Sequence, residues 1–181
     1  MVVKSRTSVR QRLFRVALVG MLAATLEVSK SILAFLPNIE VTTLLCGLYG
    51  YVFGWVGVAA TLVFIAIEPL VWGFGTWMIS YVLYWPFVAL AFMLLGRIRV
   101  RNRVLLSTVA LLFTLWFGVL TSLVDVGLFS GTYDRFFYRF SIYYVRGIGY
   151  YATQFVCNAV TFPLLFRPLA DALGKLRTRM P

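Results

Sequence analysis

The sequence contains no histidine and only six acidic residues among its 181 positions. Without histidine, the chain offers no imidazole ligand for haem or metal and no histidine general base. The acidic residues are scattered, with no pair at metal-binding spacing. No phosphate-binding loop of the GxxxxGK[ST] type occurs either. We therefore expect no catalytic residue, no cofactor, no metal and no ATPase activity in this chain.

Cysteine and charge are also scarce. Cys46 and Cys157 lie in apolar runs without CxxC spacing, so we expect each to be a buried small hydrophobe rather than a disulfide partner or metal ligand. Charged residues make up 13% of the chain, about half the fraction of an average soluble protein. Hydrophobic residues make up 61%, and the mean hydropathy is +0.89. This composition predicts an all-α integral membrane protein with a single domain over residues 1–181.

Long apolar segments predict a six-transmembrane-helix bundle, with spans at 13–36, 41–53, 56–72, 76–95, 104–129 and 140–165. The second segment has 13 residues, fewer than the roughly 20 that a full crossing needs. We expect its neighbours to shield it, or the bilayer to be thinned around it. Residues 166–181 are predicted to form a basic cytoplasmic tail.

Basic residues give the chain a net charge of +11 and predict its orientation. With six spans, three clusters fall on one side: Lys4, Arg6, Arg10, Arg12 and Arg15; Arg97, Arg99, Arg101 and Arg103; and Arg167, Lys175, Arg177 and Arg179. The positive-inside rule makes that side cytoplasmic, together with both termini. The clusters are therefore interpreted as topology anchors in a cell membrane, and no nucleic-acid partner is expected.

Several ionisable residues lie inside the predicted spans, where each costs roughly 2.5 to 3.5 kcal/mol on insertion scales. Glu27 and Lys30 are three residues apart on the first span and are expected to pair with each other, as a structural ion pair or in a functional role. Glu68, Asp125 and Arg146 lie at similar depth in the outer half. They are expected to form one buried charge network, which is either purely structural or lines a solute pocket.

Two rows of side chains favour the pocket. The sixth span carries a polar stripe of Tyr143, Arg146, Tyr150, Gln154, Asn158 and Thr161. The fourth span carries Trp77, Tyr81 and Trp85 at i, i+4 and i+8, with Tyr84 beside them. Aromatic walls with a few hydrogen-bonding groups suit a small ring-containing ligand. Trp72 and Trp77 also fit an interfacial aromatic belt, and that alternative stays open.

Glycines and small residues mark two further features. Gly73 and Gly75 would let the loop between the third and fourth spans bend over such a pocket. On the first span, Ala17, Gly20 and Ala24 form a strip of small residues that permits close helix approach in a membrane. The strip either packs within the chain or docks another membrane subunit.

Two segments carry a resemblance to a known family: LAFLPNIEVTTLL at 33–45 and IEPLVWGFGTWMISYVLYWP at 67–86. With six spans and a short second span, the chain resembles the substrate-binding S components of energy-coupling factor (ECF) vitamin transporters. The resemblance implies capture of a vitamin or related micronutrient at the outer face. It also implies partnership with a membrane coupling subunit and two cytosolic ATPases, and rotation in the membrane to release the solute. The family's AxxxA motif on the first span corresponds here to Gly20 and Ala24, so the strip of small residues would meet the coupling subunit.

Carried over by resemblance, the solute site comprises Asn38, Glu40, Glu68, Trp72, Trp77, Tyr81, Trp85, Arg146, Tyr150, Gln154 and Asn158. An alternative of a different class is a membrane scaffold of the rod-shape-determining (MreD-like) type, which has a similar size and topology but no solute. A scaffold does not need a buried pair of Glu68 and Arg146 beside aromatic side chains.

Overall fold

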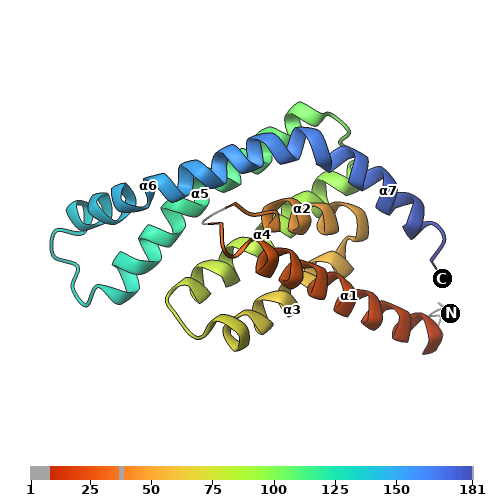
Figure 1. Ribbon diagram of the computed structural model, residues 1–181, viewed down its shortest axis with the longest axis horizontal. Coiled ribbons are helices and arrows are strands. Elements are labelled where there is room, and N and C mark those ends of the chain that lie inside the picture. Colours follow the sequence, from red (N-terminus) through yellow and green to blue (C-terminus); the bar gives the residue numbers. More distant parts are fainter. Residues whose placement is uncertain (1–8, 37–38, 181) are drawn as a thin grey trace, which may run out of the picture.

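The computed structural model describes residues 9–36 and 39–180, which form helices joined by short loops. Five helical stretches are long and apolar enough to cross a membrane: α1 (Val9–Leu33), α3 (Trp55–Trp72), α4 (Trp77–Arg97), α5 (Arg103–Phe129) and the stretch from Phe136 to Arg177. The last comprises α6 (Phe136–Thr161), a π-helical turn η1 (Phe162–Phe166) and α7 (Arg167–Arg177). The chain is an all-helical, multi-pass membrane protein (Figure 1).

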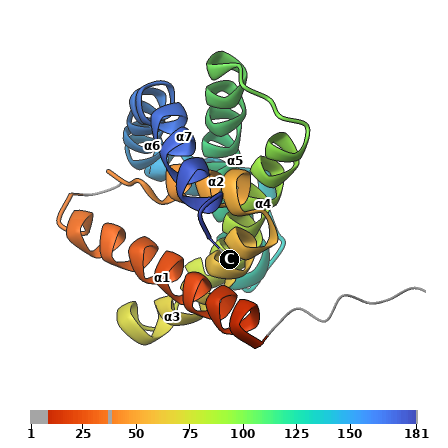
Figure 2. The ribbon, with the colours of Figure 1, turned by 90° about the vertical axis from the view of Figure 1, so that its right-hand side faces the viewer.

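The expected second span is α2 (Thr42–Phe53), a helix of 12 residues. At 1.5 Å per residue it covers about 18 Å, short of a hydrocarbon core of about 30 Å. Ten of its residues are nevertheless buried, because α1, α3, α4, α6 and α7 surround it (Figure 2). The expected shielding of this segment by neighbouring helices is therefore confirmed.

Glycine makes the close packing of α2 feasible. The chain turns back between α2 and α3 at Gly54, whose φ of +64° is readily adopted only without a side chain. A Cβ on Gly50 would lie 2.0 Å from the carbonyl oxygen of Ala89 on α4, and one on Gly57 would lie 2.1 Å from that of Tyr49. The backbones of α3 and α4 therefore approach α2 directly.

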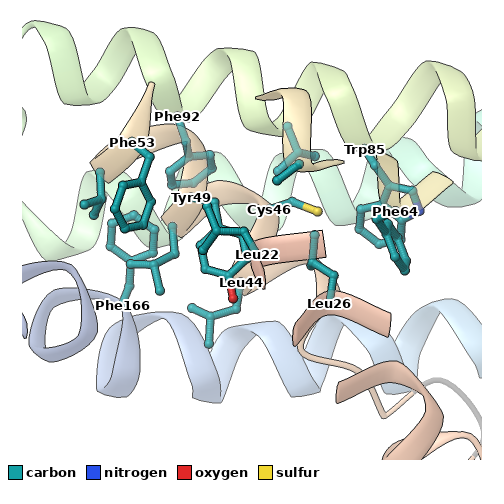
Figure 3. Packing of buried hydrophobic residues seen from close by; sticks show 14 of the residues in the cluster. Leu22, Leu26, Leu44, Cys46, Tyr49, Phe53, Phe64, Trp85, Phe92 and Phe166 are labelled. Atoms are coloured by element: carbon teal, nitrogen blue, oxygen red, sulfur yellow. The ribbon is translucent and has the colours of Figure 1, made fainter. Parts of the chain in front are cut away.

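The core lies around α2 (Figure 3). Phe92 of α4 packs against Phe166 of η1 with ring centroids 5.3 Å apart, while Phe64 of α3 is fully buried in the same cluster. Cys46 is buried there as a small hydrophobe, as the sequence predicts. Lipid tails are as apolar as these side chains, so close packing rather than transfer from water stabilises such a core.

The helices α5 and α6 form a long hairpin that extends beyond the α3–α4 connection (Figure 1). Gly118 and Gly147 leave room for the ring of Tyr151 between the two helices. Toward its tip the hairpin has no partner from α1 to α4, and in α6 only Gln154 and Asn158 are buried. This arrangement decides which residues of the polar stripe reach the rest of the molecule.

The start of α1 and the end of α7 lie at one end of the molecule (Figure 1). Arg15, Arg97 and Arg177, one from each basic cluster, line a single cavity of about 580 Å³ there. Each cluster therefore has at least one residue at this end of the molecule, while Lys4 and Arg6 of the first cluster lie outside the described residues. The segment expected as a tail is the helix α7 up to Arg177, and Ala170 is buried against the core.

Candidate functional site

A cavity of about 340 Å³ lies where the end of α1, the start of α2, the α3–α4 connection and the middle of α5 and α6 meet. Its polar and aromatic lining includes Lys30, Glu40, Thr42, Trp72, Trp77, Tyr81, Trp85, Phe117 and Gln154. Leu33, Ala34, Leu36 and Ile39 complete the apolar part. The volume is within the usual range for a small-molecule site.

Lys30 sits at one end of this cavity, within a cage of three aromatic rings. Its ammonium nitrogen lies 4.9 Å from the ring centroid of Tyr81, 5.4 Å from that of Trp72 and 5.7 Å from that of Trp77. Each distance is within the range of a cation–π interaction. The cage is built from the last turns of α1 and α3 and the first turns of α4, so the α3–α4 connection positions it.

Behind Lys30 lies the carboxyl group of Glu68, with which it forms an ion pair. Glu68 is 0% exposed, whereas the side chain of Lys30 is 23% exposed. Glu27 lies on the same side of the cage, where its carboxyl group accepts a hydrogen bond of 3.2 Å from Trp72 Nε1. Two carboxyl groups and one ammonium group are thus gathered at this end of the cavity.

These contacts correct two pairings expected from the sequence. Lys30 was expected to pair with Glu27 on its own helix, but it pairs with Glu68 on α3. The expected network of Glu68 with Asp125 and Arg146 does not form among the described residues, and Arg146 is exposed on the hairpin. The physical reason is that α1 packs against α3, whereas α6 packs mainly against α5 and the Arg146 side chain is exposed.

Glu40 connects the start of α2 to α6. Its carboxylate accepts hydrogen bonds from Thr43 N at 2.9 Å and Thr43 Oγ1 at 2.6 Å, which stabilise the first turn of α2. It also accepts from Gln154 Nε2 at 3.2 Å and Asn158 Nδ2 at 3.3 Å. Four donors therefore share this carboxylate, and its main role in this structure is to hold α6 against α2.

An aromatic wall follows the cage along α4. The ring centroids of Trp77 and Tyr81 are 4.9 Å apart, and those of Tyr81 and Trp85 are 5.6 Å apart, both in edge-to-face geometry. Phe117 of α5 lies 5.9 Å from Trp85 and closes the wall. The i, i+4, i+8 spacing seen in the sequence thus places three rings on one side of the cavity.

Two buried polar atoms in the lining have no hydrogen-bond partner among the described residues. These are Trp85 Nε1, a donor, and Gln154 Oε1, an acceptor. Both residues are 3% exposed. Buried polar groups are nearly always hydrogen-bonded, so these two lining residues have hydrogen-bonding capacity that the described residues leave unused, although neither atom is accessible from the cavity in this structure.

Comparisons with protein-family models, curated proteins and solved structures find no match for this chain. The site must therefore be interpreted from its own residues.

Six of the eleven expected site residues line the cavity: Glu40, Trp72, Trp77, Tyr81, Trp85 and Gln154. Glu68 lies behind Lys30, and Asn158 is buried outside the lining, where it bonds Glu40 and Thr114. Arg146 and Tyr150 are exposed and lie outside the lining, because they belong to the projecting part of the hairpin. Asn38 is outside the described residues.

The sequence-based set omitted Lys30, Thr42 and Phe117 from the cavity. Lys30 had a usable signal, since an ammonium inside an apolar span needs a partner or a cavity. Its spacing to Glu27 directed the interpretation to a pair on one helix instead. Phe117 carried no signal, since a phenylalanine in an apolar span is ordinary.

The strip of Ala17, Gly20 and Ala24 lies on the exposed side of α1. A Cβ on Gly20 would find no atom of other helices within 4 Å. Of the two alternatives for this strip, packing within the described part of the chain is therefore excluded. The surface remains free to meet lipid or another membrane subunit.

Proposed function

We propose that this chain is the substrate-capture (S) component of an ECF-type importer, which binds a vitamin or related micronutrient at the outer face of the cell membrane. The observation that carries the proposal is the cavity, with its aromatic wall and the unpartnered buried atoms Trp85 Nε1 and Gln154 Oε1. A small molecule with a flat ring would stack on the wall.

The position of the cavity supports an outward-facing site. Lys30 lies 15 residues beyond Arg15 on α1, which corresponds to about 22 Å along the helix. Arg15 belongs to the end that gathers the basic clusters, and the positive-inside rule assigns such an end to the cytoplasm. In the proposed topology, six spans place both termini in the cytoplasm and the cavity near the outer surface.

The energy for uptake would come from partners. The chain lacks an ATP-binding loop. In the proposed importer, two cytosolic ATPases therefore supply the free energy of ATP hydrolysis, and a membrane coupling subunit transmits it to the chain. The exposed strip around Gly20 offers the coupling subunit a flat surface for close helix contact. The chain itself would act as a binding protein and not as an enzyme.

A rod-shape-determining (MreD-like) scaffold is the competing interpretation. It would use the same helical surfaces for protein contacts, but it has no use for the caged ammonium and the two unpartnered polar atoms in the cavity. These features favour solute capture.

The test is purification of the tagged chain from the membranes of its own host in mild detergent, followed by mass spectrometry of the co-purifying proteins. We expect a membrane coupling subunit and two ATPases in a stable ratio to the chain. Recovery of cell-wall or division proteins without any ATPase would contradict the importer and favour the scaffold.

A further inference from the structure

The cage around Lys30 has the form of a binding site for a cation. Three rings, those of Trp72, Trp77 and Tyr81, surround the ammonium group within 6 Å, and Glu68 pairs with it from behind. Aromatic cages of this kind recognise ammonium groups of ligands in other proteins. Here the occupant is a side chain of the protein itself.

We propose that the solute is a small organic cation, whose charged group replaces the Lys30 ammonium within the cage of Trp72, Trp77 and Tyr81. This inference rests on the proposed function, because it assigns the chemical class of the captured solute. The Lys30 ammonium then occupies the cage when no ligand is bound. It has a flexible stem of four carbons and faces the cavity, so its ammonium can withdraw when a ligand enters.

The charges around the cage favour a cation over an anion. Glu27 and Glu68 approach the cage, and Lys30 is the one cationic residue that lines the cavity among the described residues. Each carboxyl group also has one buried oxygen without a hydrogen-bond partner in the described part of the chain, Glu27 Oε2 and Glu68 Oε1. A buried excess of carboxyl groups is costly unless a proton or another cation balances it.

The exchange itself favours a cation for a second reason. When one cation replaces another, the buried carboxylate of Glu68 stays paired throughout. An anionic ligand would instead draw Lys30 away from Glu68 and leave that fully buried carboxylate without a counter-charge. Breaking one side of a buried ion pair is strongly unfavourable.

The rest of the cavity indicates which groups the remainder of the ligand should carry. Beyond the cage, Tyr81, Trp85 and Phe117 form an aromatic wall. Trp85 and Gln154 also line the cavity, and each carries a buried polar atom without a partner among the described residues, the donor Trp85 Nε1 and the acceptor Gln154 Oε1. The ligand that fits is therefore a flat, ring-bearing cation with one hydrogen-bond acceptor and one donor at a distance from its charge.

The experiment uses three probes that share one ring but differ in charge: 1-methylnicotinamide (a cation), nicotinamide (neutral) and nicotinate (an anion). Their binding to the purified full chain is measured by ligand-observed NMR and by quenching of tryptophan fluorescence. We expect the chain to bind the cation at least about tenfold more tightly than the neutral or the anionic probe. Equal binding of the three probes, or preference for nicotinate, would overturn the proposal.

Two variants sharpen the test. Lys30→Met removes the ammonium group from the cage and is expected to strengthen binding of 1-methylnicotinamide by about tenfold or more, because the competing charge is gone. The double variant Lys30→Met/Glu68→Gln keeps the rings but removes the carboxylate of Glu68, and is expected to show a weaker preference for the cation than Lys30→Met does. Failure of the cation to bind folded Lys30→Met would contradict the cage as its site. If that variant does not fold, the selectivity of the unaltered chain among the three probes still decides.

The outcomes separate this inference from the proposed function. Preferred binding of nicotinamide or nicotinate would leave a solute site in place and reject only its cationic character. Co-purification with scaffold partners in place of ATPases would reject the importer, whatever the order of the three probes.

Discussion

Lys30 on α1 and Glu68 on α3 form an ion pair across 38 positions of the sequence, and Glu68 is completely buried beneath it. The pair joins two membrane helices at the wall of the cavity. It also fixes the ammonium group within the aromatic cage. The same contact thus contributes to the fold and to the chemistry of the candidate site.

Breaking one side of this pair should destabilise the protein. Lys30→Met is expected to lower the free energy of unfolding by about 3 kcal/mol, because the Glu68 carboxylate loses its counter-charge in a buried position. The double variant Lys30→Met/Glu68→Gln should recover most of that loss. Thermal unfolding in detergent measures both, and an equal loss in the single and double variants would show that the pair is not the cause.

The approach of α2 and α4 should depend on Gly50. Gly50→Ala places a Cβ 2.0 Å from the Ala89 carbonyl oxygen, so the helices must separate, at an expected cost of about 1 to 3 kcal/mol. The matched control is Gly149→Ala on α6, where a Cβ meets no atom of other helices within 4 Å. A lower unfolding temperature is expected for the first variant only. Identical unfolding temperatures for the two variants would contradict the close packing.

The strip of small residues on α1 should matter for partner binding and not for folding. Gly20→Leu fills an exposed position with no atom of other helices within 4 Å, so the unfolding temperature and solute binding should stay unchanged. If the chain binds a coupling subunit as proposed, recovery of that subunit in a pull-down should fall by about tenfold or more, because the bulky side chain keeps the facing helix at a distance. Gly149→Leu, the same change on α6, serves as control. Equal recovery with both variants would exclude the strip as the docking surface.

Much of the fold could be predicted from the sequence, because the length of an apolar segment reflects the thickness of a membrane directly. The five long helices agree with the long segments read from hydropathy, whereas the second predicted span is the short, buried helix α2. The row of Trp77, Tyr81 and Trp85 also lies on one face, as helical spacing requires. In each case the predicted feature lies within a single helix, so the sequence pattern is enough to predict it.

Contacts between helices could not be predicted in the same way. The polar stripe of α6 is real as a pattern, but only Gln154 and Asn158 of this helix are buried, because the hairpin projects beyond the rest of the bundle. Lys30 had an acidic neighbour on its own helix and still pairs across to Glu68. Helix-to-helix distance decides such pairings, and a one-dimensional pattern does not contain it.

The unpartnered donor Trp85 Nε1 should contribute to solute affinity. Trp85→Phe keeps an aromatic ring in the wall but removes the donor, so the Kd for the co-purified solute should rise by about tenfold. Trp116→Phe, on the exposed face of α5, is the matched control and should leave the Kd unchanged. Isothermal titration in detergent measures both values. Equal Kd values for the two variants would remove Trp85 from the site.

The most direct test of solute capture is mass spectrometry of the small molecules released when the protein, purified in mild detergent from its own host, is denatured. The proposed function predicts one ring-containing compound, in a near-stoichiometric ratio to the unaltered chain and strongly reduced in Trp85→Phe. Absence of any such compound, together with failure of host metabolite extracts to raise the unfolding temperature, would contradict a solute-binding role.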